Sequence, residues 1–177
     1  MPNMVVVDVE ADGPIPGDYS MVSFGVVLVT RKLDKTFYSD LIKPLPSAKF
    51  EQRIYDEILG IPREKYLSGK EPLTALLELE QWMKDNVDRH PIMWSDNNGF
   101  DAMFMTWYFH HFLGRNPFGW SSRRISDLYA GQTSELFGKW KHLRKTPHSH
   151  NPVDDAMGNA EALLYMFEEM EKRKHAK

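Results

Sequence analysis

The chain contains no cysteine among its 177 residues, and this absence excludes disulfide bonds and thiolate-ligated metal sites. It also has no stretch of the roughly 20 apolar residues that a membrane-spanning helix needs. The first residues lack the charged segment followed by an apolar one that is typical of a secretory signal. We therefore expect a soluble, cytoplasmic protein with no membrane partner.

An excess of positive charge is also missing, because the formal net charge at pH 7 is −3. A protein that binds nucleic acid is usually basic overall, so this value counts against that class unless the charges are unevenly distributed. Hydrophobic residues make up 42% of the chain and aromatic residues 12%, which excludes a disordered protein. No internal repeat or linker-like segment divides the sequence, so we expect a single domain over residues 1–177.

Five short segments are expected to form β-strands, and the first, second and fourth of them are mostly apolar, with many β-branched residues in the first two. The polar segment 31–35 predicts a hairpin between the second and the third strand. The expected strands are 4–10, 21–30, 36–42, 91–95 and 123–126.

Apolar residues at helical spacing predict three helices. The first begins at Pro72 and continues to Val87, and the second covers 100–113. The last begins near 151–152, where an asparagine suits the N-cap and a proline suits the first helical position. Strands in the first part and helices interleaved later predict an α/β fold with a mixed sheet.

Two carboxylates occupy alternate positions at the end of the first predicted strand. Strand geometry directs the side chains of Asp8 and Glu10 to one face and those of Val7 and Val9 to the other. Ionised acids side by side on a buried strand repel each other and are poorly solvated, and a divalent cation removes this conflict. Oxygen ligands favour Mg²⁺ or Mn²⁺. The alternative is that the strand has ended and both acids are solvated.

Further chemically useful side chains lie at the starts of the second and third predicted helices. Asp101 follows a polar turn, although an acid in a first helical turn is favoured by the helix dipole without any metal. His150 lies in a predicted loop, and Asp155 lies in the first turn of the last helix. A histidine with a pKa near neutrality can accept a proton from a metal-polarised water, while a surface loop residue is the alternative. His148 is a second candidate base, ranked below His150.

These three segments resemble, in order and spacing, the three motifs of the DEDD superfamily of 3′→5′ exonucleases, whose fold is similar to that of ribonuclease H. A histidine five positions before the last acid is typical of the DEDDh branch, and the tyrosine branch would need tyrosine where this chain has Asn151. The matching segments are D-V-E-A-D-G with Asp8 and Glu10, N-N-G-F-D with Asp101, and H-N-P-V-D-D-A with His150 and Asp155.

The resemblance implies an α/β, ribonuclease-H-like fold with a mixed five-stranded β-sheet flanked by α-helices. It also implies that Asp8 bridges two divalent cations, Mg²⁺ or Mn²⁺. Glu10 and Asp155 would complete the site of the cation that activates water, and Asp101 would hold the second one. His150 would act as the general base.

The product implied by the resemblance is a nucleoside 5′-monophosphate released from the 3′ end of a single-stranded nucleic acid. Small family members of the ribonuclease T and oligoribonuclease type often trim RNA as homodimers. RNA is therefore slightly favoured over DNA, and a homodimer is one option for the assembly.

A basic segment precedes His150 directly. Lys139, Lys141, Arg144 and Lys145 surround an aromatic residue and fit a surface that contacts phosphates, while a solvated face is the alternative. Asn97, which matches an asparagine common in the second motif, is a further candidate for nucleic-acid binding.

Other side chains near the motifs have simpler expected roles. Asp12 and Asp18, in the loop after the first motif, are expected to be solvated. Phe104, Trp107 and Tyr108 are expected to pack in the core rather than to stack on bases.

Two other classes of function fit parts of the sequence. A catalytically silent nucleic-acid-binding module would be expected to have lost one of the acids or the histidine, and all five are present. A phosphoesterase for small nucleotides would not explain the basic segment before His150. The sequence therefore favours an exonuclease over both.

Overall fold

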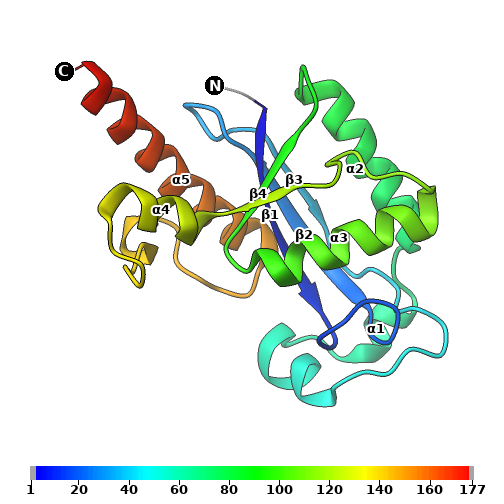
Figure 1. Ribbon diagram of the computed structural model, residues 1–177. Coiled ribbons are helices and arrows are strands. Elements are labelled where there is room, and N and C mark those ends of the chain that lie inside the picture. The colour runs from blue at the N-terminus through cyan, green and yellow to red at the C-terminus, as the bar shows by residue number, and fades with distance from the viewer. Residues whose placement is uncertain (1–2, 176–177) are drawn as a thin grey trace.

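A five-stranded sheet with the strand order β3-β2-β1-β4-β5 lies at the centre of the structure, a computed structural model that describes residues 3–175 (Figure 1). β1, β2 and β3 pair in antiparallel fashion, whereas β4 runs parallel to β1 and β5 runs parallel to β4. The predicted mixed sheet and hairpin are therefore confirmed. The strands are β1 (Met4–Ala11), β2 (Met21–Leu28), β3 (Thr36–Ser39), β4 (Ile92–Ser95) and β5 (Ser122–Arg124).

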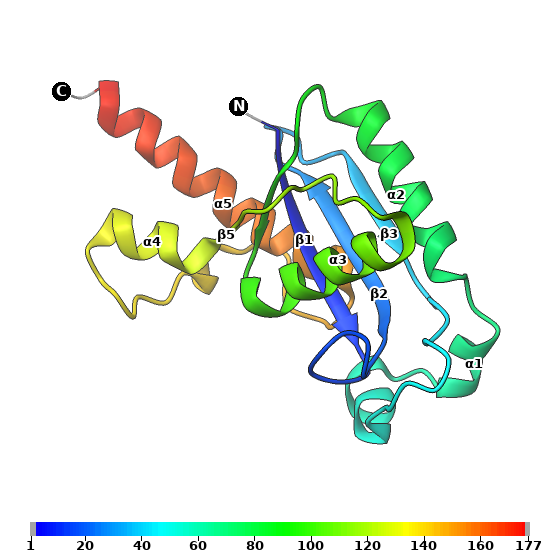
Figure 2. The ribbon, with the colours of Figure 1, turned by 45° about the vertical axis from the view of Figure 1, so that its right-hand side comes forward.

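Helices cover both faces of this sheet (Figure 2). α2 and α3 pack on one face against Val5, Val7 and Val9, while α5 packs on the other face against Met4 and Val6. This alternation along β1 is the strand periodicity that the sequence shows. The helices are α1 (Arg63–Leu67), α2 (Pro72–Asn86), α3 (Asn98–Leu113), α4 (Ile125–Thr133) and α5 (Pro152–His175), with a π-helix at Ile54–Leu59 and a 3-10 helix at Lys141–Leu143.

The structure differs from the sequence-based elements mainly after the fourth strand. β5 covers Ser122–Arg124 instead of the predicted 123–126, because Ile125 and Ser126 already belong to α4, a helix that was not predicted. α4 carries a short apolar stripe, Ile125, Leu128 and Tyr129, which packs in the same core cluster as α5, but only Ile125 is fully buried and the stripe covers little more than one turn. The second and third strands end earlier than predicted, at Leu28 and Ser39.

Gly25 allows the start of α5 to approach the sheet closely. This glycine lies on β2 opposite Asp8, and a Cβ added to it would lie 2.3 Å from the backbone nitrogen of Val153. A larger residue would push the first turn of α5 away from β1. The first turn of α5 carries Asp155, so Gly25 helps to bring that carboxylate to Asp8.

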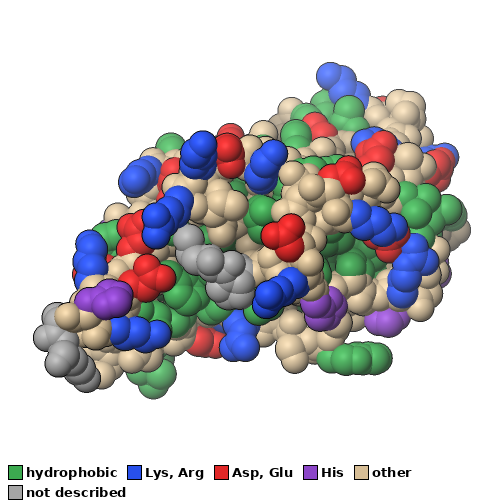
Figure 3. Space-filling view, turned by 90° about the horizontal axis from the view of Figure 1, so that it is seen from above, with side chains coloured by type: hydrophobic (Ala, Val, Ile, Leu, Met, Phe, Trp, Pro, Cys, Tyr) green, Lys and Arg blue, Asp and Glu red, His purple; other side chains and the backbone are tan. Residues whose placement is uncertain are grey.

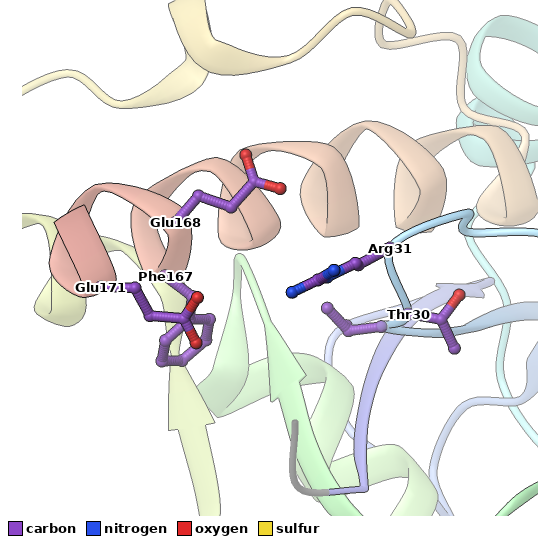
Figure 4. Close-up of a pocket in the computed structure, with 6 residues that line it drawn as sticks. Thr30, Arg31, Phe167, Glu168 and Glu171 are labelled. Carbon is purple, nitrogen blue, oxygen red and sulfur yellow. The ribbon is translucent and has the colours of Figure 1, made fainter.

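A pocket of about 630 Å³ lies between α5 and the segment after β2 (Figure 4). Phe167, Glu168 and Glu171 line it from the helix, and Arg31 extends towards them. Phe167 is more than three helical turns beyond Asp155, so this pocket is separate from the predicted catalytic residues. Within residues 3–175, no helix combines the length and the apolar character needed to cross a membrane.

Candidate active site

Three of the predicted acids meet where β1 and the first turn of α5 lie side by side. Asp8 and Glu10 point to the face of β1 that α5 covers, and Asp155 faces them from the helix. Ligand oxygen atoms of the three carboxylates all lie within 4.8 Å of one another. A set of hard oxygen donors at this spacing fits a divalent cation such as Mg²⁺ or Mn²⁺.

Asp101 contacts β1 from α3, the helix that packs on the other face of the sheet from α5. It lies in the first turn of α3 with only 3% of its surface exposed. Its Oδ1 accepts a hydrogen bond of 3.0 Å from the backbone N–H of Val9, which is the residue between Asp8 and Glu10. The fourth acid is thus fixed at the cluster by the backbone of β1.

The positive charge near the clustered carboxylates does not balance their negative charge. Burial, together with the neighbouring charges of Asp101, Glu10 and Asp155, raises the pKa of Asp8 well above its ordinary value, and Arg144 partly opposes this. The pKa of Glu10 is raised to about 8, mainly by burial and to a lesser extent by repulsion from Asp155 and Asp101. Burial also raises the pKa of Asp101 to about 7. Such mutual repulsion is relieved when cations bind between the carboxylates.

Asp155 organises the loop that precedes α5. Its carboxylate is 1% exposed and accepts backbone N–H bonds from Ser149 at 3.2 Å and from His150 at 3.0 Å. The Nη2 of Arg144 lies 2.8 Å from Oδ1, and the Nδ1 of His148 lies 2.8 Å from Oδ2. One carboxylate therefore holds both histidines and the arginine next to β1.

Both candidate bases lie at the cluster. The His150 side chain is 45% exposed, and its Nδ1 lies 3.9 Å from Oε1 of Glu10. The His148 ring is centred 4.3 Å from the His150 ring. His150 adopts a left-handed backbone conformation with φ 58°, which turns the chain into the start of α5.

The structure places Arg144 apart from the other residues of the basic segment. Its side chain is 7% exposed and lies inside the site, against Asp155, instead of on the surface. It passes across α5 at Gly158, where an added Cβ would lie 2.4 Å from Nε of the arginine. Sequence reasoning missed this arrangement, and the available signal was a glycine inside a predicted helix.

The remaining nucleic-acid-binding candidates are accessible. Asn97, Lys139, Lys141 and Lys145 are exposed, and the Nζ of Lys141 lies 2.7 Å from a carboxylate oxygen of Asp96. On the face seen from above, basic and acidic side chains are interspersed without a continuous basic patch (Figure 3).

The expected solvation of Asp12 is wrong. Its side chain is fully buried and accepts a hydrogen bond from the hydroxyl of Tyr55 at 2.9 Å, because the π-helix folds back over the loop after β1. Asp18 is about half exposed and pairs with Lys49 on the surface. Asp12 therefore supports the loop from within and is not available to solvent.

The aromatic residues that follow Asp101 are mostly core residues. Phe104 and Tyr108 are fully buried, and the Tyr108 hydroxyl accepts a hydrogen bond from the backbone of Met21. Trp107 is only partly buried and also borders a surface groove. The prediction of core packing thus holds for Phe104 and Tyr108 and is incomplete for Trp107.

Comparison with known proteins gives a close sequence relative, although no protein-family model matches the chain. The 3′-5′ DNA exonuclease Cap18 of Escherichia coli is 30% identical over 183 residues, which cover 96% of this chain and 94% of the relative. The fold is shared with several solved nucleases at lower identity.

Three of these structures illustrate the match. The nuclease domain of 3′hExo, a DEDDh family member bound to rAMP, has a TM-score of 0.72 at 17% identity and covers 94% of this chain and 92% of its own. Cell-death related nuclease 4 has a TM-score of 0.75 at 14% identity, with 96% and 64% covered. E. coli Exonuclease I in complex with a dA16 oligonucleotide has a TM-score of 0.70 at 15% identity, with 97% and 43% covered.

The sheet topology, the sequence relative and the acids gathered at β1 together define a 3′→5′ exonuclease with a ribonuclease-H-like fold. The chain belongs to the DEDDh family of 3′→5′ exonucleases. Dependence on divalent metal follows from that membership and agrees with the oxygen donors at the site.

Proposed function

We propose that this exonuclease removes nucleoside 5′-monophosphates one at a time from the 3′ end of single-stranded DNA. The observation that carries the proposal is the meeting of Asp8, Glu10 and Asp155 within 4.8 Å, with His150 beside them. The expected preference for RNA rested on analogy, whereas the relative at 30% identity is named as a DNA exonuclease. One structural neighbour is bound to dA16, and another recognises the 3′ end of a histone mRNA stem-loop, so RNA stays in the test as the competing substrate.

The four acids are proposed to bind two divalent cations, Mg²⁺ or Mn²⁺. Asp8, Glu10 and Asp155 would hold one cation, and Asp101 together with Asp8 would hold the other. When bound, the pair would supply positive charge to the attacking water, the scissile phosphate and the leaving oxygen.

His150 is proposed as the general base that takes the proton from the attacking water. Its ring is half-exposed at the mouth of the site, and Glu10, 3.9 Å from Nδ1, can orient it. The Nδ1 of His148 is occupied by Asp155, a carboxylate that is itself proposed to bind a cation. For this reason His148 ranks second, as a residue that positions the loop.

Asn97, Lys139, Lys141 and Lys145 are proposed to contact the phosphates of the substrate, because they are exposed and Lys141 reaches Asp96 at the end of β4. Arg144 is proposed to position Asp155 instead of contacting the substrate. The proposal further includes one exonuclease domain over residues 1–177, a cytoplasmic location and a homodimer as the assembly to be tested.

The test uses 5′-labelled single-stranded DNA and RNA of the same sequence, each with Mg²⁺, with Mn²⁺ and with EDTA. With either metal we expect the labelled strands to be shortened stepwise from the 3′ end, and the DNA faster than the RNA. We expect no cleavage in EDTA. Asp8→Ala serves as the inactive control. Faster shortening of the RNA would overturn the DNA assignment, and no cleavage of either strand would overturn the proposed reaction.

A further inference from the structure

An exposed groove of about 780 Å³ runs along the outer side of α3. Asn98 and Gly99 line it at one end, and His110 and Trp120 line it farther along. Asn98 and Gly99 share the first helical turn with Asp101, so the groove begins beside the candidate active site. From Asn98 to His110 the helix rises about 18 Å, which is the length of several nucleotides of one strand.

Trp120 stands in solvent at this groove with 94% of its surface exposed. This exposure, together with its place at a groove that begins beside the candidate active site, points to a binding role. The loop that carries it is anchored. Phe118 is 5% exposed and packs edge-on against Phe109, and the Nδ2 of Asn116 donates a hydrogen bond to the carbonyl of Gly119 at 3.0 Å.

Flat rings continue along the groove from Trp120. The His110 ring is centred 5.9 Å from the Trp120 ring at an interplanar angle of 28°, and His111 stacks on Trp107 at 4.4 Å and 10°. The bases of single-stranded nucleic acid stack on rings of this kind irrespective of sequence. Among the described residues that line the groove, none is Asp or Glu, so no carboxylate of the lining faces the phosphates of a bound strand.

We propose that this groove binds the bases of the single strand upstream of the 3′-terminal nucleotide, with Trp120 as the stacking platform. The inference rests on the proposed function, since it adds a binding subsite for the same substrate. A duplex would not use the platform, because its bases are already stacked on one another. The groove therefore favours a single strand that is long enough to reach from the site to Trp120.

The test compares oligothymidylates of two, six and ten nucleotides on the wild type, Trp120→Ala and Phe137→Ala. Phe137 is a matched control, because it is 91% exposed and lies outside the groove, in the segment between α4 and the 3-10 helix. Binding is measured by fluorescence anisotropy in EDTA, and KM and kcat are measured with Mg²⁺. We expect Trp120→Ala to weaken binding of the ten-nucleotide strand and raise its KM by about tenfold, within the range of one lost stacking contact. The dinucleotide and Phe137→Ala should show no change.

Equal binding and KM for the wild type and Trp120→Ala at all three lengths, with hydrolysis intact, would overturn the groove assignment and leave the proposed function standing. Absence of hydrolysis by the wild type would instead overturn the proposed function, while the anisotropy series would still test the groove. Light scattering tests the other possible occupant of the groove, which is a second copy of the chain. A wild-type dimer that Trp120→Ala dissociates, without any change in KM, would assign this face to a second copy of the chain and refute the proposal.

Discussion

The guanidinium of Arg144 lies 2.8 Å from Oδ1 of Asp155, and the two side chains are only 7% and 1% exposed. A positive charge is thus buried at a cluster of acids that is proposed to bind cations. In the absence of metal, Arg144 offsets part of the repulsion within the cluster, since it lowers the pKa of Asp8 against the effect of burial. Arg144 would also keep Oδ1 of Asp155 in place when a cation is bound at the cluster.

Replacing Arg144 with methionine should destabilise the protein strongly, because it leaves Asp155 buried without its partner. We expect a loss of about 3–5 kcal/mol in the free energy of unfolding in EDTA, the usual cost of breaking a buried pair. Lys49→Met is the control, because Lys49 and Asp18 form an exposed pair that should contribute little. Urea unfolding of both variants measures the difference, and equal midpoints would contradict a structural role for the buried pair. Rescue of kcat by Arg144→Lys, but not by Arg144→Met, would support positioning of Asp155.

Gly158→Ala should lower both the melting temperature and the activity, although alanine favours a helix by about 1 kcal/mol over glycine. The added Cβ would lie 2.4 Å from Nε of Arg144 and would displace the guanidinium from Asp155. Gly131→Ala is the matched change in α4, where a Cβ meets no atom within 4 Å, and it should be neutral or stabilising. Differential scanning fluorimetry compares the two, and a rise in melting temperature for Gly158→Ala would argue against the packing described.

The metal-free protein should become less stable as the pH rises from about 4.5 to 8. Glu10 has a pKa of about 8 in the folded state against an ordinary value of 4.5, so the folded state binds more protons than the unfolded state in this window. The free energy of unfolding therefore falls with increasing pH. Melting curves in EDTA at pH 5.5 and 8 measure the slope, and Glu10→Gln should reduce it. Mg²⁺ should raise the melting temperature more at pH 8 than at pH 5.5, and an equal rise at both pH values would count against the assigned carboxylates.

His150→Ala should reduce kcat by about 100-fold or more, which is the usual contribution of a general base. His148→Ala should reduce it less, because that ring contacts Asp155 and has no proposed proton to accept. A larger loss in His148→Ala than in His150→Ala would exchange the two roles.

Much of the fold could be predicted from the sequence because its signals are local. β-branched runs mark β1 and β2, and the Asn-Pro pair marks the start of α5. The acids Asp8 and Glu10 could be placed on one face because strand periodicity fixes their directions. α4 was missed because its apolar stripe, Ile125, Leu128 and Tyr129, is short and begins inside the segment predicted as the fifth strand.

The long-range contacts of the site could not be predicted from the sequence. The burial of Asp12 depends on Tyr55, which lies 43 positions away, and the pairing of Arg144 with Asp155 depends on a loop folding over Gly158. Sequence proximity grouped Arg144 with the surface lysines, whereas packing separates it from them. The exposure of Trp120 likewise follows from an anchored loop that no local pattern indicates.

The most direct test of the central claim compares Asp155→Asn with Asp154→Asn in release of nucleotides from 5′-labelled single-stranded DNA with Mg²⁺. The two acids are neighbours in the first turn of α5, but Asp155 is buried at the cluster and Asp154 is exposed. Asparagine keeps the shape of the side chain but removes both the charge proposed to bind a cation and the partner of Arg144, so a melting curve of each variant first establishes that it is folded at the assay temperature. The account predicts at least about a 100-fold loss of rate for Asp155→Asn, as expected for removal of a metal ligand, and near wild-type rate for Asp154→Asn. Comparable rates for the two variants would contradict it.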